Sequence, residues 1–330
     1  EDKPKFKVAW TIYAGWMPWD YAAQSGIIRK WADKYHIDIE VVQINDYVES
    51  INQYTAGGFD GCVMTNMDAL TIPAAGGVDS TALIVGDFSN GNDGIVLKGK
   101  STLGDLKGQK VNLVELSVSH YLLARGLERA GLSEKDLKVV NTSDADLVAA
   151  FATDDVQAVA TWNPLLAEIE ATPGVTKVFD SSQIPGEIID LMVVNSDTLK
   201  DNPELGKALT GAWYEIMATM SADSDAGKAA REHMAKASGT DLAGYEAQLA
   251  ATKMFYSAKD AVAFANSPKL PATMTKVAEF SFSHGLLGEG AQSAEAVGMA
   301  FAKGITTGDK DNVKLRFDPS YMEMAAQGKL

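Results

Sequence analysis

The sequence predicts an α/β protein of two lobes, each built on a mixed, mainly parallel sheet flanked by helices. Three observations lead to this fold class. Strand-like and helix-like segments alternate from residue 6 to residue 89, the alternation starts again near residue 110 and continues to 179, and the chain after residue 197 is almost wholly helix-like. Such alternation is typical of parallel sheets covered by helices. With 330 residues, the chain is long enough to bury a core in each lobe.

In the first lobe, hydrophobic patterning predicts strands at 6–12, 37–44, 60–65 and 81–86. We expect a helix that runs to about Tyr35 after the first strand and a short helix over 47–55 after the second. Polar or aromatic residues follow each of these strands. The carboxyl ends of parallel strands meet at one edge of a sheet, where ligands of open α/β proteins bind.

The second lobe begins with a new run of strands, expected at 110–115, 137–140, 156–161 and 175–179. The segment 188–195 reads as a strand that carries the chain back. We therefore place residues 95–195 in a second lobe inserted into a first lobe of residues 1–94 and 196–330, with a hinge at the two crossings. The remaining helices are expected to pack on the first lobe, at 202–221, 224–238, 241–251, 258–265 and 271–284.

Composition excludes several classes of partner. The net charge of −15 argues against nucleic acid and anionic membranes, and it weakly favours a cationic or neutral ligand, although acidic surfaces also serve solubility. No apolar run reaches the ~18 residues of a membrane span, so we expect a soluble chain. Cys62 is the single cysteine, which rules out an intramolecular disulfide and a thiolate metal cluster. No signal peptide is visible, but a mature chain would have lost it, so this absence decides nothing about location.

The sequence lacks the common motifs of enzymes. The sequence has no P-loop, no G-x-S-x-G element and no dinucleotide-binding fingerprint. The four histidines are scattered and lack the spacing of metal ligands: His36, His120, His233 and His284. We expect a protein that is not an enzyme and that has neither a metal nor a cofactor.

Several segments resemble one family. The chain resembles periplasmic substrate-binding proteins of ABC importers in five segments. They are 108–111, 117–123, 130–132, 155–164 and the turn at 66–69. The similar branch serves taurine, sulfonates, nitrate and thiamine-pyrimidine precursors, and the likeness covers nearly the whole chain. The resemblance implies the type II periplasmic binding fold, capture of a solute in the interlobe cleft by hinge closure, an ABC permease as partner, a monomer, and a periplasmic location with or without a lipid anchor.

A narrower resemblance bears on the ligand. The segments 10–19 and 64–70 resemble a group whose genes are associated with urea carboxylase-type enzymes, now understood largely as guanidine carboxylases. This likeness implies guanidine, or a closely related small nitrogen compound, as the ligand. Urea, a small amide or a sulfonate such as taurine is the alternative. Alternatives of another class are a cofactor-free enzyme or a sensor lobe, but eukaryotic thiamine-pyrimidine synthases of this branch need a cysteine-rich motif that one cysteine cannot match.

One departure from the family pattern supports a cation. Most of the branch has a glycine just before the serine of the second-lobe helix, where anionic ligands meet free N–H groups. This chain has Leu116 there, preceded by Glu115. A carboxylate so close to the helix start disfavours a sulfonate or nitrate.

A guanidinium host needs carboxylates in the plane of the cation and aromatic faces above it. The first lobe offers both at its strand ends. Each aromatic residue either packs in the core or faces the cleft, and we expect at least one to face it; Asp46 and Asp68 fit helix caps as well. The first-lobe candidates are Trp10, Tyr13, Trp16, Trp19, Asp46, Asn66, Asp68 and Asp87.

The second lobe and the return strand supply the other candidates. Ser117 also fits a helix cap, His120 also fits a packed helix residue, and we expect Trp162 to have little reason for burial. Asp190 is flanked by Ile and Leu, so it is expected to be buried and to need either a protein cation or a bound one. These candidates are Glu115, Ser117, His120, Trp162, Asn163 and Asp190.

Overall fold

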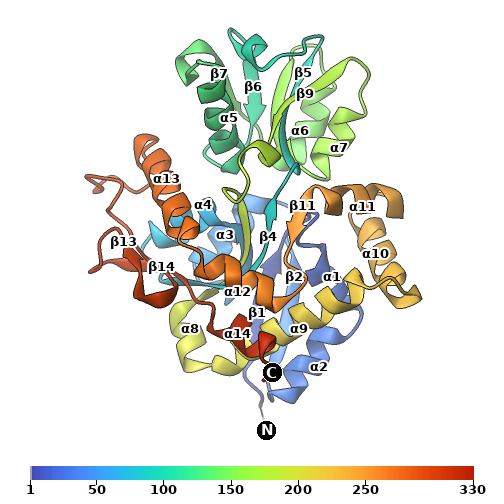
Figure 1. Cartoon of the computed structure of the whole chain (residues 1–330), viewed down its shortest axis with the longest axis vertical. Coiled ribbons are helices and arrows are strands. Elements are labelled where there is room, and N and C mark those ends of the chain that lie inside the picture. Colours follow the sequence, from blue (N-terminus) through green and yellow to red (C-terminus); the bar gives the residue numbers. More distant parts are fainter. Residues whose placement is uncertain (1) are drawn as a thin grey trace. The chain divides into compact units, whose positions relative to one another are not determined.

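The computed structural model describes residues 2–330 and divides into two compact units (Figure 1). Unit 1 contains the chain up to Asp87 together with Ile189–Ala247 and Met254–Leu330, and unit 2 contains Phe88–Ile188 and Gln248–Lys253. The sequence analysis placed the changes of lobe at 94/95 and 195/196 and left 248–253 in the first lobe. This short segment belongs to unit 2 because the Asn90 amide donates to the Ala251 carbonyl at 2.9 Å.

The sheet of unit 1 has the order β13-β12-β14-β4-β10-β3-β1-β2, with β11 paired to β4. β1 pairs in parallel with β2 and β3, whereas β10 runs antiparallel to β3 with Asp190 opposite Thr65. The beginning of β10 therefore lies beside the end of β3. The strands described here are β1 (Lys5–Trp10), β2 (Asp38–Gln43), β3 (Gly61–Thr65), β4 (Ser80–Ser89) and β10 (Ile189–Asn195).

The last part of the chain contains strands that the sequence analysis missed. β14 pairs in parallel with β4 and so extends the sheet of unit 1. The prediction of an almost wholly helical region was wrong because these strands have five residues or fewer, too few for an alternating pattern to be recognised. They are β11 (Thr252–Met254), β12 (Gly298–Ala300), β13 (Thr306–Thr307) and β14 (Val313–Phe317).

Helices surround the sheet of unit 1, and α9 packs against both α1 and α2. The single helix predicted up to Tyr35 is two helices, because Gly26 lies between them in the left-handed region with φ 81°. The helices and helical turns are α1 (Met17–Gln24), α2 (Ile27–Lys34), α3 (Tyr47–Thr55), α4 (Asn66–Ala69), η1 (Leu70–Ala74), α8 (Ser196–Asp201), α9 (Pro203–Ser221), α10 (Asp225–Ala237), α11 (Leu242–Ala250, which continues into unit 2), α12 (Ala258–Asn266), α13 (Lys269–Ser283), η5 (Ala302–Gly304) and α14 (Ser320–Ala326).

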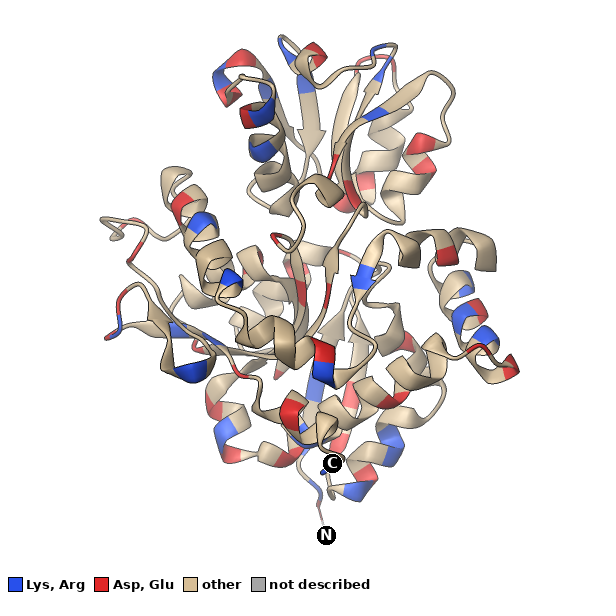
Figure 2. Ribbon diagram, in the orientation of Figure 1, with Lys and Arg blue, Asp and Glu red and all other residues tan. Residues whose placement is uncertain are grey.

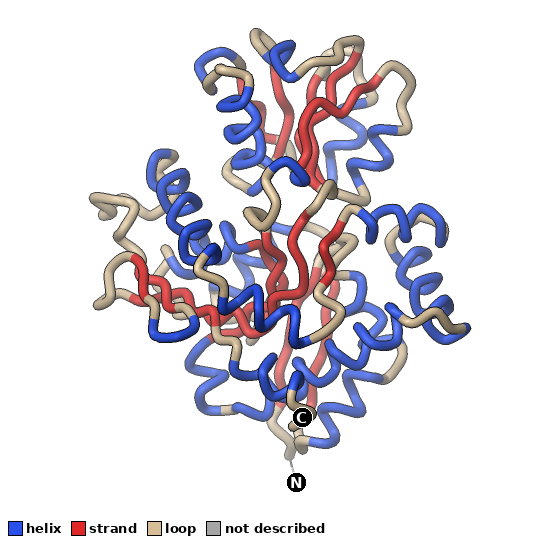
Figure 3. The backbone as a smooth tube through the Cα atoms, in the orientation of Figure 1, coloured by secondary structure: helices blue, strands red, loops and turns tan. Residues whose placement is uncertain are grey.

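Unit 2 has its own sheet of order β7-β6-β8-β5-β9, visible as neighbouring strands in Figure 3. β6 pairs in parallel with β7 and β8, and β5 is antiparallel to β8 and β9. The predicted class, mixed sheets flanked by helices, is confirmed. The elements are β5 (Asp93–Lys98), η2 (Leu103–Leu106), β6 (Lys110–Leu113), α5 (Val118–Arg129), η3 (Glu134–Asp136), β7 (Lys138–Asn141), α6 (Asp144–Phe151), β8 (Ala158–Trp162), α7 (Leu165–Glu170), β9 (Val175–Asp180) and η4 (Ser181–Gln183).

Charged residues of both signs are interspersed on the helices. Figure 2 shows acidic and basic positions side by side on α5 and α10, for example. Within residues 2–330, no helix combines the length and the apolar character needed to cross a bilayer.

The close contact between α9 and α2 gives a test of the core of unit 1. A Cβ atom added at Gly211 would lie 2.4 Å from two ring atoms of Trp31. We expect Gly211→Ala to lower the free energy of unfolding by about 1–3 kcal/mol, as overpacking does, measured by urea denaturation. Gly290→Ala is the control, since an added Cβ there meets no heavy atom of the described chain within 4 Å. Equal stability of the two variants would contradict this packing.

Candidate functional site

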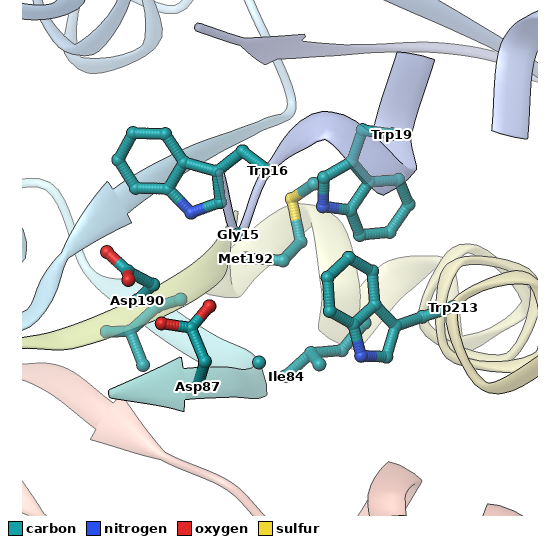
Figure 4. A pocket seen from close by; sticks show the side chains of 10 residues that line it. Gly15, Trp16, Trp19, Ile84, Asp87, Asp190, Met192 and Trp213 are labelled. Carbon is teal, nitrogen blue, oxygen red and sulfur yellow. The ribbon is translucent and has the colours of Figure 1, made fainter. Parts of the chain in front are cut away.

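A small recess in unit 1 brings together acidic and aromatic side chains (Figure 4). We call it the acidic recess. About 190 Å³ of space lies in and around it, open solvent included, but its enclosed part has room for about one water molecule. It is lined by Gly15, Trp16, Trp19, Ile84, Gly86, Asp87, Asp190, Leu191, Met192 and Trp213.

Two neighbouring strands position the carboxylates of the recess. Asp87 lies near the end of β4, Asp190 lies near the start of β10, and β4 and β10 are adjacent in the sheet. Figure 4 shows the two carboxyl groups next to each other, facing the ring of Trp16. Both residues are buried, Asp87 with 0% and Asp190 with 3% of the residue's surface exposed.

The acid pair is electrostatically unfavourable when both members are charged. The pKa of Asp190 lies well above its ordinary value, first because of burial and then because of the nearby Asp87 carboxyl, to which it is also hydrogen-bonded; a hydrogen bond from Tyr13 opposes the shift. The Oδ2 atom of Asp190 is buried and has no hydrogen-bond partner within the described chain. No Lys, Arg or His is among the ten residues that line the recess. Without a bound ligand, the pair of Asp87 and Asp190 therefore retains a proton at pH values where an exposed Asp is ionised.

Aromatic rings form the walls of the recess. The rings of Trp19 and Trp213 stack with centroids 5.1 Å apart, and that of Trp16 stacks on Tyr47 at 5.4 Å. Tyr13 is tilted against Trp16 at 4.9 Å. Electron-rich ring faces beside two carboxylates make an environment that attracts cations.

Gly15, in the turn before α1, leaves room for the carboxylate of Asp87. A Cβ atom added at Gly15 would lie 2.3 Å from Oδ2 of Asp87, closer than any real contact. A glycine is therefore required at this position as long as Asp87 points into the recess. Gly15 was not among the predicted site residues.

Comparison with known proteins now gives the family. The profile of the family described as NMT1/THI5 like matches residues 33–226, more than half of the chain. The chain belongs to the NMT1/THI5-like family.

Curated relatives of this NMT1/THI5-like chain carry the names of binding proteins. It is 28% identical over 144 residues to a putative binding protein of Brucella abortus, which is 43% of this chain and 44% of the relative. Identity to the putative aliphatic sulfonates-binding protein of Escherichia coli is 37% over 83 residues, 25% of this chain and 26% of the relative. The taurine-binding periplasmic protein of Escherichia coli is 26% identical over 129 residues, 38% and 40% of the two chains. The chain thus spans less than half the length of these relatives.

Solved structures share the fold at low identity. The alkanesulfonate-binding protein SsuA from Xanthomonas axonopodis pv. citri, bound to MOPS, has a TM-score of 0.70 at 17% identity, over 88% of this chain and 96% of that one. The nitrate-binding protein NrtA from Synechocystis PCC 6803 has a TM-score of 0.61 at 13% identity, over 100% and 99%. The NMT1/THI5-like chain therefore has the fold of periplasmic binding proteins, as the sequence predicted.

The structure brings four of the predicted site residues into the lining of the acidic recess: Trp16, Trp19, Asp87 and Asp190. Tyr13 adjoins them through its ring, which is tilted against that of Trp16 with 4.9 Å between centroids. Trp10 is buried at the end of β1 and is not among the lining residues. All four predicted aromatic residues have at most 5% of their surface exposed, so Trp16 and Trp19 form walls of the recess and not open faces.

The other first-lobe candidates have local structural roles and are not among the lining residues. Asp46 is exposed and caps α3, where its Oδ1 accepts from the Glu49 amide at 2.9 Å. Asn66 Oδ1 accepts from the Ile189 amide at 3.1 Å, which fixes the start of β10 next to Asp190. Asp68 is buried beside Tyr47.

The loop before α5 in unit 2 contains Leu116, which stands where most of the similar branch has a glycine. Leu116 has φ 66°, in the left-handed region that favours glycine, and Glu115 is exposed. Ser117 caps α5, accepting from the Ser119 amide at 3.1 Å. His120 is buried; its Nδ1 accepts from the Leu116 amide at 3.1 Å and its Nε2 contacts Glu134.

The strand end of β8 has its own hydrogen-bond network in unit 2. Asn163 Oδ1 accepts from the Ala167 amide at 2.9 Å in the first turn of α7, and Asn163 Nδ2 donates to Asn92 Oδ1 at 2.7 Å. The expectation that Trp162 has little reason for burial was wrong, since it is 6% exposed.

Sequence reasoning missed several residues that line the recess. Met192 could have been found, because it lies two positions after Asp190 in a strand and therefore on the same face. Trp213 lies in the middle of the long helix α9, and nothing in its local sequence distinguishes it from a core residue.

Proposed function

We propose that this chain is the solute-binding component of an ABC importer, and that it captures guanidinium, or a closely related small nitrogen cation, in the acidic recess. A periplasmic location and delivery to a permease are part of this proposal. The observation that carries it is the burial of Asp87 and Asp190 together between indole rings, with no basic residue in the lining. A cation bound beside both carboxylates would offset their mutual repulsion.

The importer role is supported by the relatives. Names such as taurine-binding periplasmic protein and aliphatic sulfonates-binding protein belong to proteins that share part of this sequence, and the fold is that of periplasmic binding proteins. Hinge closure around the ligand stays a prediction of the sequence analysis.

Guanidinium suits the chemistry of the recess. It is planar, carries only N–H donors and remains charged, so it donates to carboxylates and lays its face against aromatic rings. Asp87 and Asp190 supply the acceptors, and Trp16 supplies a ring, an attraction of about 0.5–2 kcal/mol. The cation would replace the proton that Asp87 and Asp190 share in the ligand-free protein.

A sulfonate such as taurine is the second candidate. The names of the Escherichia coli relatives favour it, as do the indole N–H groups of Trp16 and Trp213, which are buried without a hydrogen-bond partner in the described structure and could serve sulfonate oxygens. Against it stands the repulsion between a sulfonate and the two buried carboxylates.

A thermal-shift comparison separates these ligands. Guanidinium at micromolar concentrations, far below those that denature proteins, is expected to raise the melting temperature, whereas equal concentrations of sodium chloride, urea, taurine and sodium nitrate are expected to have little effect. Stabilisation should reach about 2.7 kcal/mol at a hundredfold excess over the Kd. Stabilisation by taurine or nitrate without stabilisation by guanidinium would overturn the choice of ligand.

Gly15 gives a steric test of the same site. Gly15→Ala forces the carboxylate of Asp87 to move, since the added Cβ would lie 2.3 Å from Oδ2. We expect guanidinium affinity, measured by isothermal titration calorimetry, to fall at least tenfold. Gly290→Ala is the control for the added methyl group. Wild-type affinity in Gly15→Ala would show that Asp87 does not hold the ligand.

A further inference from the structure

We infer that Asp68 is a positioning residue of the acidic recess: it anchors Tyr47, and through Tyr47 it fixes the ring of Trp16 against which the ligand lies, without contacting the ligand itself. This inference rests on the proposed function. It replaces the direct ligand contact that the sequence suggested for Asp68.

The hydroxyl of Tyr47 is held by two groups of one buried hydrogen-bond network. It donates to Asp68 Oδ2 at 2.6 Å and accepts from the Thr65 amide at 3.0 Å. The Thr65 hydroxyl donates to the same carboxylate oxygen at 2.8 Å. All three residues are buried, so these bonds are shielded from water.

The ring of Tyr47 fixes the orientation of Trp16 in the wall of the recess. Trp16 stacks on it with 5.4 Å between centroids and 26° between planes. Trp16 also lines the acidic recess, whereas Tyr47 and Asp68 are not among its lining residues. Because Tyr47 covers one face of the Trp16 ring, the rest of that ring faces the recess in one fixed orientation. Cation–π attraction depends on that orientation.

The charge of Asp68 strengthens the anchor. A hydrogen bond to a carboxylate is roughly twice as strong as one between neutral groups. Burial raises the pKa of Asp68 to about 6, while the hydrogen bonds from Tyr47 and Thr65 oppose the shift. Asp68 is therefore ionised at mildly alkaline pH, where the anchor is at its strongest.

A double-mutant cycle tests the path from Asp68 to Trp16. Guanidinium titrations are made on wild type, Tyr47→Phe, Trp16→Leu and the double variant. Tyr47→Phe is expected to weaken binding three- to tenfold on the wild-type background and to have little further effect when Trp16 is already Leu. Equal effects on both backgrounds, or no effect of Tyr47→Phe, would overturn the inference.

Substitutions at Asp68 separate positioning from contact. Asp68→Ala is expected to weaken binding at least tenfold and to change the near-ultraviolet circular dichroism of the tryptophans; Asp68→Asn, which keeps an acceptor for Tyr47, should recover part of both. Loss of affinity with a wild-type tryptophan signal would mean that Asp68 acts by direct contact or through its charge on Asp190, and would contradict the inference. Asp46→Asn is the control, since Asp46 is exposed and Asn also caps helices.

The two proposals fail in different ways. If wild type does not bind guanidinium, the proposed ligand is wrong. The tryptophan signal of ligand-free Tyr47→Phe and Asp68→Ala still tests the positioning, and an unchanged signal in both would overturn it. If Asp68→Ala does not fold, Tyr47→Phe carries the test alone, because it removes a single hydroxyl.

Discussion

Replacing either acid of the recess by its amide, in Asp87→Asn or Asp190→Asn, is expected to weaken guanidinium binding at least a hundredfold. The loss corresponds to about 2.8 kcal/mol, within the range for removing one partner of a buried charged pair. Both residues are almost fully buried, so water does not screen the missing charge. The measurement is isothermal titration calorimetry at mildly alkaline pH.

Stability separates this result from simple unfolding. The pKa of Asp190 is raised, so its ionisation destabilises the empty protein at high pH, and an amide removes that cost. We therefore expect ligand-free Asp190→Asn to be at least as stable as wild type at mildly alkaline pH, in urea denaturation. Asp46→Asn, an exposed acid outside the recess, should bind guanidinium as wild type does. Unchanged affinity in Asp190→Asn would refute the role of the pair.

Guanidinium affinity is expected to rise with pH, with a slope of up to tenfold per pH unit. The pKa of Asp190 lies well above its ordinary value, so the pair retains a proton at acidic pH, and the cation must displace it. Affinity is therefore low below the ordinary range of Asp and increases until the pH passes the raised pKa. Guanidinium itself stays charged throughout.

Calorimetry from acidic to mildly alkaline pH, in buffers of different ionisation enthalpy, measures both the affinity and the protons released. About one proton per ligand should leave on the rising part of the curve. Asp190→Asn should flatten the profile. A sulfonate in the same recess would show the reverse dependence, because protonation of the acids reduces its repulsion. Affinity independent of pH would contradict a protonated empty pair.

The predicted ligand residues that line the acidic recess lie at strand ends or shortly after them. Asp87 and Asp190 could be recognised because a carboxylate in an apolar strand is costly without a function, and adjacent strands bring their side chains together. Trp16 and Trp19 could be recognised because the turn after β1 is unusually aromatic. Hydrophobic patterning was sufficient to place the strands from β1 to β10 with the exception of β5 (Asp93–Lys98), which was not predicted.

Tertiary packing accounts for what the sequence analysis missed. Trp213 reaches the recess from α9 through its stacking on Trp19, a contact between segments far apart in the chain. Ser117 and Asn163 have backbone partners within one helical turn, so their local roles as caps competed with a role in binding. The strand β14 became recognisable only through its pairing with β4.

A crystal structure of the protein grown with a small molar excess of guanidinium tests the central claim most directly. We predict planar density in the acidic recess, with nitrogen atoms within hydrogen-bond distance of both Asp87 and Asp190 and one face against the ring of Trp16. Guanidinium bound elsewhere while the recess holds only water, or an anion in the recess, would contradict the account.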